Sequence, residues 1–396
     1  MKNTERKSAR RYDTPGRSRL FTDKVYSGKC DDREKLMKEV FSTERDYFYP
    51  PKSEYNIYFG ELHGHTLLSD GRPTLDDYFV NIRDNAKLDF AAISDHDHGG
   101  IGKPELFGEP WEFTKSKVKQ YYEPHKFTTI LAYERDSYPW YNNMVVYYNS
   151  HDADMLPHSI NGELTRKELE DMLKRDDVLF APHDTYHLEA GADLVSIDKS
   201  LLPPLFEMYS RGDSAEYFDN PWNVRDIMCE GGFFQDALKR GARMGVIAAS
   251  DDHGCRNGLL RENEDYYPGI SMYPGITGVL AKENTLEGIF EALKARRCYG
   301  FMGSKRVYID FRINGHYMGE EFSCDGDRSV YFKIESEVKV KKVTVVKNCR
   351  DYMIIKRPEQ LFFDYKAENE TDTYYLRVEL SDGRLAWTSP VFVTKE

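Results

Sequence analysis

Short apolar runs that alternate with segments of helical periodicity constrain the fold of this chain more than any other feature. From Asn56 onward, each apolar run ends in polar residues and an amphipathic segment follows it. Strands that alternate with helices predict a mostly parallel β-sheet. Roughly six or seven such units are too many for a small sheet. We therefore expect an α/β fold with a closed or distorted (β/α) barrel rather than a doubly wound sheet.

Helix-start signals locate two of the helical segments. Thr74 is the expected N-cap of a helix over residues 74–87, whose apolar side chains share one face. Thr165 and Glu168 form a capping-box pattern at the start of the segment 165–176. Further helical segments are expected near 113–122, within 223–241 and at 285–297, and apolar runs lie at 90–97, 127–136, 144–150, 178–184, 202–210, 244–253 and 275–281.

The pattern changes after about Ser304, where helical periodicity ends. Short alternating segments follow, with turn signals at Asn314-Gly315 and Asp382-Gly383. They predict an antiparallel β-sandwich. We therefore expect three parts: an N-terminal arm over 1–52 with one short helix and no assigned chemistry, a catalytic barrel over 53–303, and a β-sandwich domain over 304–396.

Composition narrows the classes of partner. The formal net charge of -12 argues against general binding of nucleic acid or of an anionic membrane, because no basic excess is available to offset a polyphosphate. No segment approaches the ~18 apolar residues of a membrane span, and residues 1–21 lack the apolar core of a signal peptide. The six cysteines form no C-x-x-C pair, which is typical of reduced thiols. We expect a soluble, cytoplasmic protein of unassigned oligomeric state.

Polar side chains gather where the apolar runs end. His63 and His65 stand as His-x-His at the end of the first run, where alternate side chains share one face of a strand and reach one metal ion. Later runs end in or contain further histidines and carboxylates, and the ends of parallel barrel strands converge on one face. The candidate metal ligands are His63, His65, Asp70, His96, Glu134, His183, Glu207, Asp251 and His253.

Imidazoles and carboxylates without thiolates suit zinc, manganese or iron. The set exceeds the needs of one tetrahedral ion, so we expect two or three divalent ions, with a carboxylate such as Glu134 bridging some of them. The alternative for Glu207 and Asp70 is that each orients a histidine instead of binding metal. The chain has no G-x-G-x-x-G or Walker-type loop, so a nucleotide-binding Rossmann or P-loop fold has no support.

The ordered motifs HGHTLLSDG, SDHD, the strand-end Glu134, APH around His183, and ASDDH resemble those of the PHP family, named after polymerase and histidinol phosphatase. The resemblance covers about residues 56–303. The C-terminal segment with AWTSPVFV further resembles a PHP branch with an appended β-sandwich. The resemblance implies a distorted seven-stranded (β/α) barrel, up to three divalent ions and phosphoester hydrolysis. By motif, the ligand positions fall on His63, His65, His96, Glu134, His183, Asp251 and His253.

Two positions depart from this family pattern. Some members have a histidine near the place of Asp70, and some have a histidine or cysteine on the strand that here carries Glu207. The occupancy of a third metal depends on these two residues.

These observations lead to a hypothesis of phosphomonoester or phosphodiester hydrolysis by a metal-bridging hydroxide. Arg135 and Arg211 are candidates to bind a phosphate oxygen, with a salt bridge at the rim as the alternative. His98 and His187 are candidates for the general acid, with a supporting or exposed position as the alternative.

The substrate is expected to be a small or oligomeric anion. Aromatic residues near the expected site, Tyr138, Trp140, Tyr141 and Trp111, are candidates to stack a sugar or nucleobase, or to form a lid that packs on itself. The alternative function is a metal-dependent hydrolase or lyase that acts on an amide, ester or glycan bond, because the same ions polarise a carbonyl. A non-catalytic binding module is disfavoured by the complete ligand set.

Overall fold

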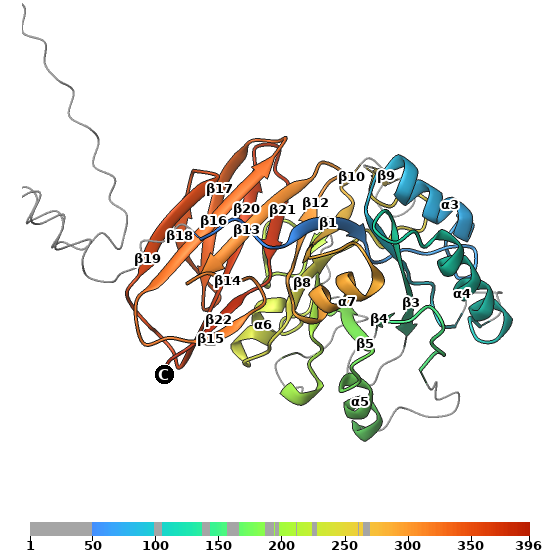
Figure 1. The fold of residues 1–396 in the computed structure, drawn as a ribbon, viewed down its shortest axis with the longest axis horizontal. Helices are drawn as coiled ribbons and strands as arrows, with labels where there is room; N and C mark the ends of the chain where they lie inside the picture. The colour runs from blue at the N-terminus through green and yellow to red at the C-terminus, as the bar shows by residue number, and fades with distance from the viewer. Residues whose placement is uncertain are drawn as a thin grey trace, which may run out of the picture.

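The computed structural model describes most of the chain after the first 49 residues. The described residues are 50–98, 105–136, 143–156, 166–186, 194, 198–210, 212–223, 228–259, 261–263 and 270–396. They form a mixed α/β structure with one thirteen-stranded sheet and smaller sheets of four, three and two strands (Figure 1). The α/β class predicted from the sequence is confirmed. Its finer description as a barrel followed by a β-sandwich stays a prediction.

The first part of the chain alternates strands and helices. Its strands are β1 (Asn56–Glu61), β2 (Phe90–Ile93), β3 (Thr128–Asp136), β4 (Asn143–Tyr148), β5 (Val178–His183), β6 (Leu205–Ser210), β7 (Asp213–Ser214), β8 (Gly245–Ala248), β9 (Arg261–Asn263), β10 (Ile270–Met272), β11 (Gly275–Ala281) and β12 (Cys298–Met302). Its helices are α3 (Leu75–Val80), the π-helix η2 (Asn81–Asn85), α4 (Glu109–Tyr121), α5 (Arg166–Leu173), the 3-10 helix η3 (Lys199–Leu201), α6 (Phe234–Lys239) and α7 (Leu286–Lys294).

The last part of the chain is built of strands among the described residues. They are β13 (Val307–Ile313), β14 (His316–Tyr317), β15 (Glu321–Ser323), β16 (Arg328–Ser336), β17 (Val340–Lys347), β18 (Arg350–Ile355), β19 (Glu359–Asp364), β20 (Thr371–Leu380), β21 (Leu385–Thr388) and β22 (Val391–Thr394). Four of them form a sheet in the order β14-β13-β16-β19, and the others join the large sheet.

Strand direction follows the sequence prediction only in part. β1, β2 and β3 pair in parallel, as do β6 and β8. β4 is antiparallel to both β3 and β5, and β11 is antiparallel to both β1 and β12. The prediction of a mostly parallel sheet is wrong at these two strands. At β4 the reason is the connection 137–142, which is too short for a crossover helix and returns the chain in the opposite direction.

The large sheet runs from the first part of the chain into the last. β12 pairs with β21 through Tyr299 opposite Thr388, Gly300 opposite Trp387 and Phe301 opposite Ala386. In Figure 1 the orange and red C-terminal strands therefore lie directly beside β12 and β8, away from α3 and α4. The predicted domain boundary at residue 304 falls just after a strand that belongs to this shared sheet.

The first helix begins where the sequence predicts. The hydroxyl of Thr74 accepts the backbone N–H of Asp77 at 3.1 Å, and the Asp77 carboxylate accepts the Thr74 backbone N–H at 3.3 Å, which completes a capping box. Leu75, Tyr78 and Phe79 are buried on one face. Helix α5 begins at Arg166, so the expected cap Thr165 lies outside the described residues. The short helix expected in the N-terminal arm also lies outside them.

Alternate residues of β3 face two different parts of the core. Ile130 and Ala132 pack with one cluster of buried side chains, whereas Leu131 and Tyr133 pack with the other. This period of two decides where the residues at the end of β3 point. Among the described helices, none combines the length and apolar composition that a membrane span requires.

Candidate metal centre

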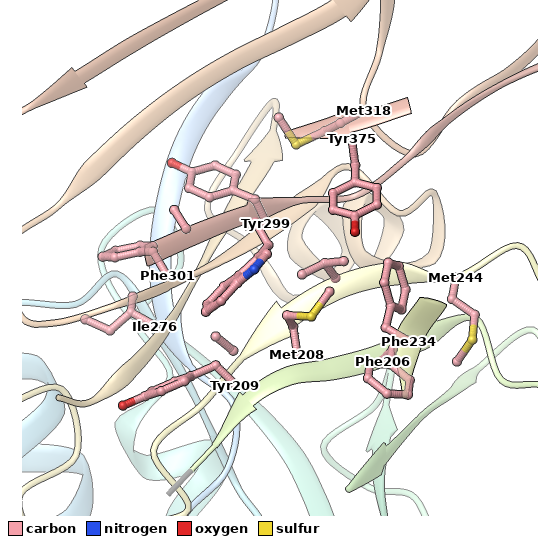
Figure 2. Close-up of a cluster of buried hydrophobic side chains, with 14 of the residues drawn as sticks. Phe206, Met208, Tyr209, Phe234, Met244, Ile276, Tyr299, Phe301, Met318 and Tyr375 are labelled. Carbon is pink, nitrogen blue, oxygen red and sulfur yellow. The ribbon is translucent and has the colours of Figure 1, made fainter. Parts of the chain in front are cut away.

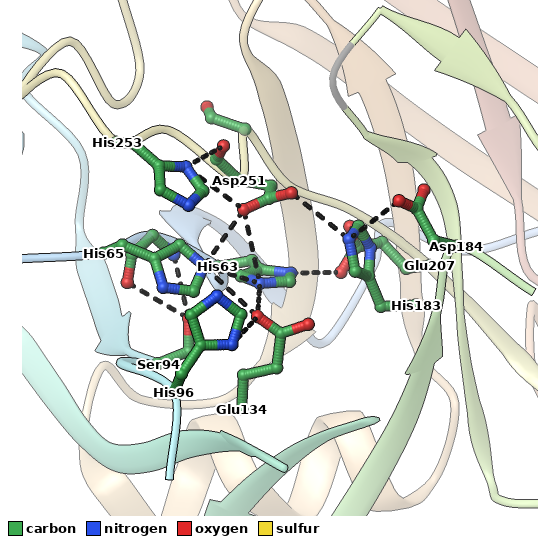
Figure 3. Close-up of polar contacts among 12 residues, drawn as sticks. His63, His65, Ser94, His96, Glu134, His183, Asp184, Glu207, Asp251 and His253 are labelled. Carbon is green, nitrogen blue, oxygen red and sulfur yellow. Dashed lines mark hydrogen bonds and ion pairs between the residues drawn. The ribbon is translucent and has the colours of Figure 1, made fainter. Parts of the chain in front are cut away.

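The nine predicted ligands lie in one cluster where six strands end (Figure 3). His63 and His65 follow β1, and His96 follows β2. The remaining members come from β3, β5 and β6 and from the segments that follow β1 and β8: Asp70, Glu134, His183, Glu207, Asp251 and His253. The structure thus brings together side chains that are far apart in the sequence. Their role as ligands stays a prediction.

Backbone hydrogen bonds join the segments that carry these side chains. The N–H of Asp251 donates to the carbonyl of His63 at 3.0 Å, and the N–H of His65 donates to the carbonyl of Asp252 at 3.1 Å. The N–H of Glu134 donates to the carbonyl of Asp95 at 3.1 Å. Isolated parallel bridges therefore join the segment after β1 to the segment after β8, and the segment after β2 to β3. They fix the spacing of the side chains above the sheet.

The most buried end of the cluster holds two histidines and a carboxylate. The two Glu207 oxygens lie 3.0 Å from His63 Nδ1 and 3.1 Å from His183 Nδ1. The side chains of His63 and Glu207 are fully buried, and that of His183 is nearly so. Asp184 Oδ2 lies 3.5 Å from His183 Nε2. Three ligand atoms from His63, His183 and Glu207 are close enough together for one ion.

The middle of the cluster contains two carboxylates that face several imidazoles. Glu134 Oε2 lies 3.1 Å from His63 Nε2, 3.2 Å from His65 Nε2 and 3.3 Å from His96 Nδ1. Asp251 Oδ1 lies 3.0 Å from His65 Nε2, and Asp251 Oδ2 lies 3.2 Å from His183 Nε2. Both carboxylates therefore lie between imidazoles that belong to different ligand sets.

The end of the cluster that lies opposite the buried one is open to solvent. Asp70 Oδ1 lies 3.1 Å from His253 Nε2, 3.6 Å from His96 Nε2 and 3.8 Å from His65 Nδ1. The Asp70 side chain is 45% exposed, and those of His96 and His253 are about one-seventh exposed. This end of the cluster is therefore its most solvent-accessible part.

The carboxylates of the cluster need positive charge close to them. Burial lowers the pKa of His63, but the carboxylates of Glu207, Asp251 and Glu134 outweigh burial and raise this pKa to about 10. Burial raises the pKa of Glu134, but the neighbouring histidines hold it well below its usual value. Carboxylates this close together require either charged imidazoles or bound cations.

The donor set fits divalent metal ions. Four ligand atoms from His63, His65, Glu134 and Asp251 lie within 4.8 Å of one another, and the Nε2 atoms of the two histidines are only 3.3 Å apart. Glu134 Oε1 is buried and accepts no hydrogen bond from the described residues. An ion between these atoms would satisfy the lone pairs that now face one another. The cluster can therefore hold metal.

A network of short polar side chains fixes the loop that follows β1. Asp95 is buried and accepts hydrogen bonds from the Thr66 N–H at 2.7 Å, the Thr66 hydroxyl at 2.6 Å and the Ser69 hydroxyl at 2.6 Å. Ser69 Oγ also lies 3.3 Å from His65 Nδ1. Ser94 accepts the Gly64 N–H at 2.9 Å. The sequence analysis missed the role of these residues, although all lie in its motifs.

Glu61, at the end of β1 next to the cluster, is a further residue that was not predicted. Its fully buried carboxyl group accepts the backbone N–H of Ser250 at 2.9 Å and also the Ser250 hydroxyl. The N–H of His63 lies 3.3 Å from Glu61 Oε1. Glu61 therefore joins the segment that carries His63 to the segment that carries Asp251. Only its position at the end of an apolar run indicated this in the sequence.

Of the four predicted catalytic residues, the structure describes two, and only one of these two lies beside the cluster. The His98 ring stacks on His96, with centroids 5.1 Å apart. Arg135 is buried on the face of β3 opposite Glu134, where it interacts with Tyr133. The structure therefore does not bring Arg135 into the cluster, because successive side chains of a strand point to opposite faces. His187 and Arg211 lie outside the described residues.

Of the four aromatic residues predicted near the site, the structure describes only Trp111. Tyr138, Trp140 and Tyr141 lie outside the described residues. Trp111 lies inside helix α4 and is 4% exposed, with its Nε1 donating to the carbonyl of Ala153 at 3.0 Å. The prediction that Trp111 is available to stack a sugar or nucleobase is wrong. Its large apolar ring is buried in the core.

Comparison with known proteins gives distant relatives. No family model matches the chain. An uncharacterised protein of Chlamydia pneumoniae is 23% identical across 85% of this chain and 57% of its own length. An uncharacterised protein of Chlamydia trachomatis is 22% identical across 91% of this chain and 61% of its own length. The chain thus spans about three-fifths of the curated relatives that it matches.

Solved structures also show weak similarity. A two-domain protein from Bacteroides vulgatus, described as containing a predicted PHP-like metal-dependent phosphoesterase, is 14% identical with a TM-score of 0.42, over 88% of this chain and 99% of that chain. Fibronectin(III)-like modules from Clostridium thermocellum are 22% identical with a TM-score of 0.19, over 22% of this chain and 96% of that chain. At these values neither similarity establishes a family for the chain.

Proposed function

We propose that this chain is a metal-dependent phosphoesterase that hydrolyses a phosphomonoester or phosphodiester. One observation carries the proposal: nine imidazole and carboxylate side chains form three adjoining sets of ligand atoms where the strands end. Adjacent sets share His63 or His65, so ions bound in them would be neighbours. Two or three divalent ions, of manganese, zinc or iron, suit these nitrogen and oxygen donors.

The charge of the ligand set favours an anionic substrate. Its four carboxylates, from Asp70, Glu134, Glu207 and Asp251, carry four negative charges when ionised. Two divalent ions would balance these charges, and a third would leave two positive charges. With three ions bound, the centre would attract an anionic phosphoryl group rather than a neutral substrate.

The residues at the open end determine how a substrate would approach. Bound divalent ions would supply an activated water and neutralise charge on the phosphoryl oxygens. Asp70, with His253 and His96, surrounds the accessible end of the cluster. We assign the general acid to His98, which stacks on His96 at this end and would donate a proton to the leaving oxygen.

The proposal includes the finer description of the fold. Residues 53–303 would form a distorted (β/α) barrel, because parallel strands β1 to β3 and β6 with β8 present their carboxyl ends to one site. Residues 304–396 would form an antiparallel β-sandwich. The neighbouring β5 and β6, together with β8 and β12, support the barrel arrangement.

Turnover of simple phosphate esters by the metal-loaded protein tests the proposal. The full chain is loaded separately with manganese, zinc and iron and assayed with nitrophenyl phosphate mono- and diesters. Amide, ester and glycan substrates in the same assay test the alternative reaction class. Turnover of phosphate esters supports the proposal, whereas turnover confined to the other substrates, or no turnover with any metal, contradicts it.

A double variant, His63→Ala with His65→Ala, connects turnover to the cluster. These two histidines contribute to all three ligand sets, so the variant should lose measurable turnover and bound metal. Circular dichroism should show that the strands and helices remain. Retained turnover by a folded variant would exclude this cluster as the active site.

A further inference from the structure

The C-terminal strands contact β6, which carries Glu207, and β8, which precedes the segment that carries Asp251. Trp387 of β21 is fully buried, and its ring stacks on that of Tyr209 in β6 at a centroid distance of 6.3 Å. The hydroxyl of Ser389 accepts the backbone N–H of Val246 in β8 at 2.8 Å. Figure 2 shows Tyr375 of β20 and Phe234 in the same apolar core as Met208 and Tyr209. The C-terminal part therefore packs against the back of the metal centre.

A single buried carboxylate joins these parts most directly. Glu216 is fully buried, and its Oε1 accepts the Tyr375 hydroxyl at 2.7 Å and Arg377 Nη1 at 2.8 Å. Its Oε2 accepts Trp387 Nε1 at 2.8 Å. All three donors belong to β20 and β21. A carboxylate buried away from water is costly unless it is paired, so these donors hold Glu216 in one position.

The segment that carries Glu216 is attached to the strand of Glu207. β7 pairs with the end of β6 through Tyr209 opposite Ser214. Beyond this pair, the N–H of Ala215 donates to the carbonyl of Met208 at 2.8 Å. Met208 follows Glu207 directly, and the two side chains face opposite sides of β6. A shift of Glu216 would therefore move the backbone on which Glu207 stands.

We propose that Glu216 is a positioning residue for the metal centre, through which β20 and β21 hold Glu207 against His63 and His183. This inference rests on the proposed metal centre. On this proposal the C-terminal strands help to form the metal centre, and do not only form a separate domain. Glu216 itself would touch neither metal nor substrate.

Asp364 provides a matched control for Glu216. Its buried carboxylate accepts Lys347 Nζ at 2.6 Å and the hydroxyls of Tyr374 at 2.7 Å and Tyr352 at 3.1 Å. It therefore also has three side-chain donors. These donors all lie within the C-terminal strands β17, β18 and β20. A change at Asp364 tests the effect of lost stability alone.

The experiment compares Glu216→Gln with Asp364→Asn in the full chain. Each metal-free protein is titrated with Co²⁺, whose visible absorption reports its coordination, and unfolded with urea. We expect both variants to lose stability, because each removes a buried charge from its donors. Only Glu216→Gln should lower the Co²⁺ affinity of the tightest site, by about 10- to 100-fold, and change the absorption of the bound Co²⁺. Losses of this size are typical when a residue that orients a metal ligand is changed.

Each outcome separates the inference from the proposed function. If the wild-type chain binds no Co²⁺, Mn²⁺ or Zn²⁺, the metal centre itself is excluded and the inference with it. If the wild type binds metal and Glu216→Gln matches its affinity and absorption, the positioning role is overturned. Should Glu216→Gln not fold, Trp387→Phe keeps an aromatic ring and removes the Nε1–H donor to Glu216 together with part of the buried ring system. The same two criteria then apply to Trp387→Phe.

Discussion

Single residues behind the ligands determine how well the ligands are oriented. Ser69 donates to the buried Asp95 and lies 3.3 Å from His65 Nδ1, so it connects the imidazole to a fixed acceptor. Residues in this position govern the orientation and basicity of a metal-binding histidine. The loop after β1 therefore has a function beyond supplying two histidines.

Ser69→Ala should weaken metal binding without unfolding the protein. Removal of the hydroxyl frees the His65 ring to rotate, and we expect a loss of about 10- to 100-fold in metal affinity. Titration with Mn²⁺ or Zn²⁺ measures it. Ser116→Ala is the control, because that hydroxyl donates to the carbonyl of Phe113 on the exposed side of α4. Equal affinities in both variants would show that Ser69 does not orient His65.

Glu61 should make the stability of the metal-free protein depend on pH. Burial raises its pKa to about 8, even though Ser250 and the His63 N–H donate hydrogen bonds to it. Because the pKa is higher in the folded than in the unfolded chain, this carboxyl stabilises the fold at low pH. That contribution should fall by up to about 1.4 kcal/mol per pH unit as the pH rises from about 4.5 to about 8.

Urea unfolding of the metal-free chain across this pH range measures the effect. Nearby histidines also titrate, so the difference between the wild type and Glu61→Gln isolates the carboxyl. Glu61→Gln should unfold with a smaller loss of stability at rising pH. Parallel curves for the two proteins would contradict a raised pKa of Glu61.

At the scale of elements, helix α3 illustrates a local signal that tertiary structure does not override. Its capping box, Thr74 with Asp77, was visible in the sequence as an N-cap followed by acidic residues. Its buried face lies in the same apolar core as β2, and the Tyr78 hydroxyl donates to the carbonyl of Ala92 at 2.6 Å. The helix stabilises the sheet without contributing a ligand.

Thr74→Ala should therefore lower the free energy of unfolding by about 1 kcal/mol, because the N–H of Asp77 loses its acceptor. Urea denaturation measures the change. Thr74→Ser retains the hydroxyl and should be close to the wild type. Metal affinity should be unchanged in both variants, and a loss of metal in Thr74→Ala alone would show that the helix influences the site.

At the scale of the whole molecule, the continuous sheet decides whether the predicted domains are independent. β12 pairs with β21, and Trp387 fills the core beside Tyr209. Cutting the chain at residue 303 would expose the edge of β12 and remove the three donors to Glu216.

A fragment of residues 50–303 should therefore not unfold cooperatively. Loss of the fully buried Trp387 ring alone should lower the free energy of unfolding by about 3 to 5 kcal/mol, which is a large part of the stability of an ordinary domain. Thermal unfolding followed by circular dichroism, with the full chain beside it, measures this. A fragment that melts cooperatively and binds metal would show that the first part folds alone.

The sequence by itself determined the features that depend on local order. Apolar runs and helical periodicity predicted the α/β class, the start of α3 at Thr74 and the nine side chains that the structure gathers. These follow from periodicity and from the rule that polar residues end buried strands. The period of two along β3 would also have separated Arg135 from Glu134, had it been applied.

Only the tertiary structure decided the features that depend on which segments meet. The antiparallel pairing of β11 with β1, the burial of Trp111 and the contacts of Glu61 with Ser250 arise from partners distant in sequence. Glu216 is the clearest case, because its three donors lie 159 to 171 residues further along the chain. No local pattern marks such a residue. Its significance comes from burial, since a carboxylate removed from water must find donors wherever the fold supplies them.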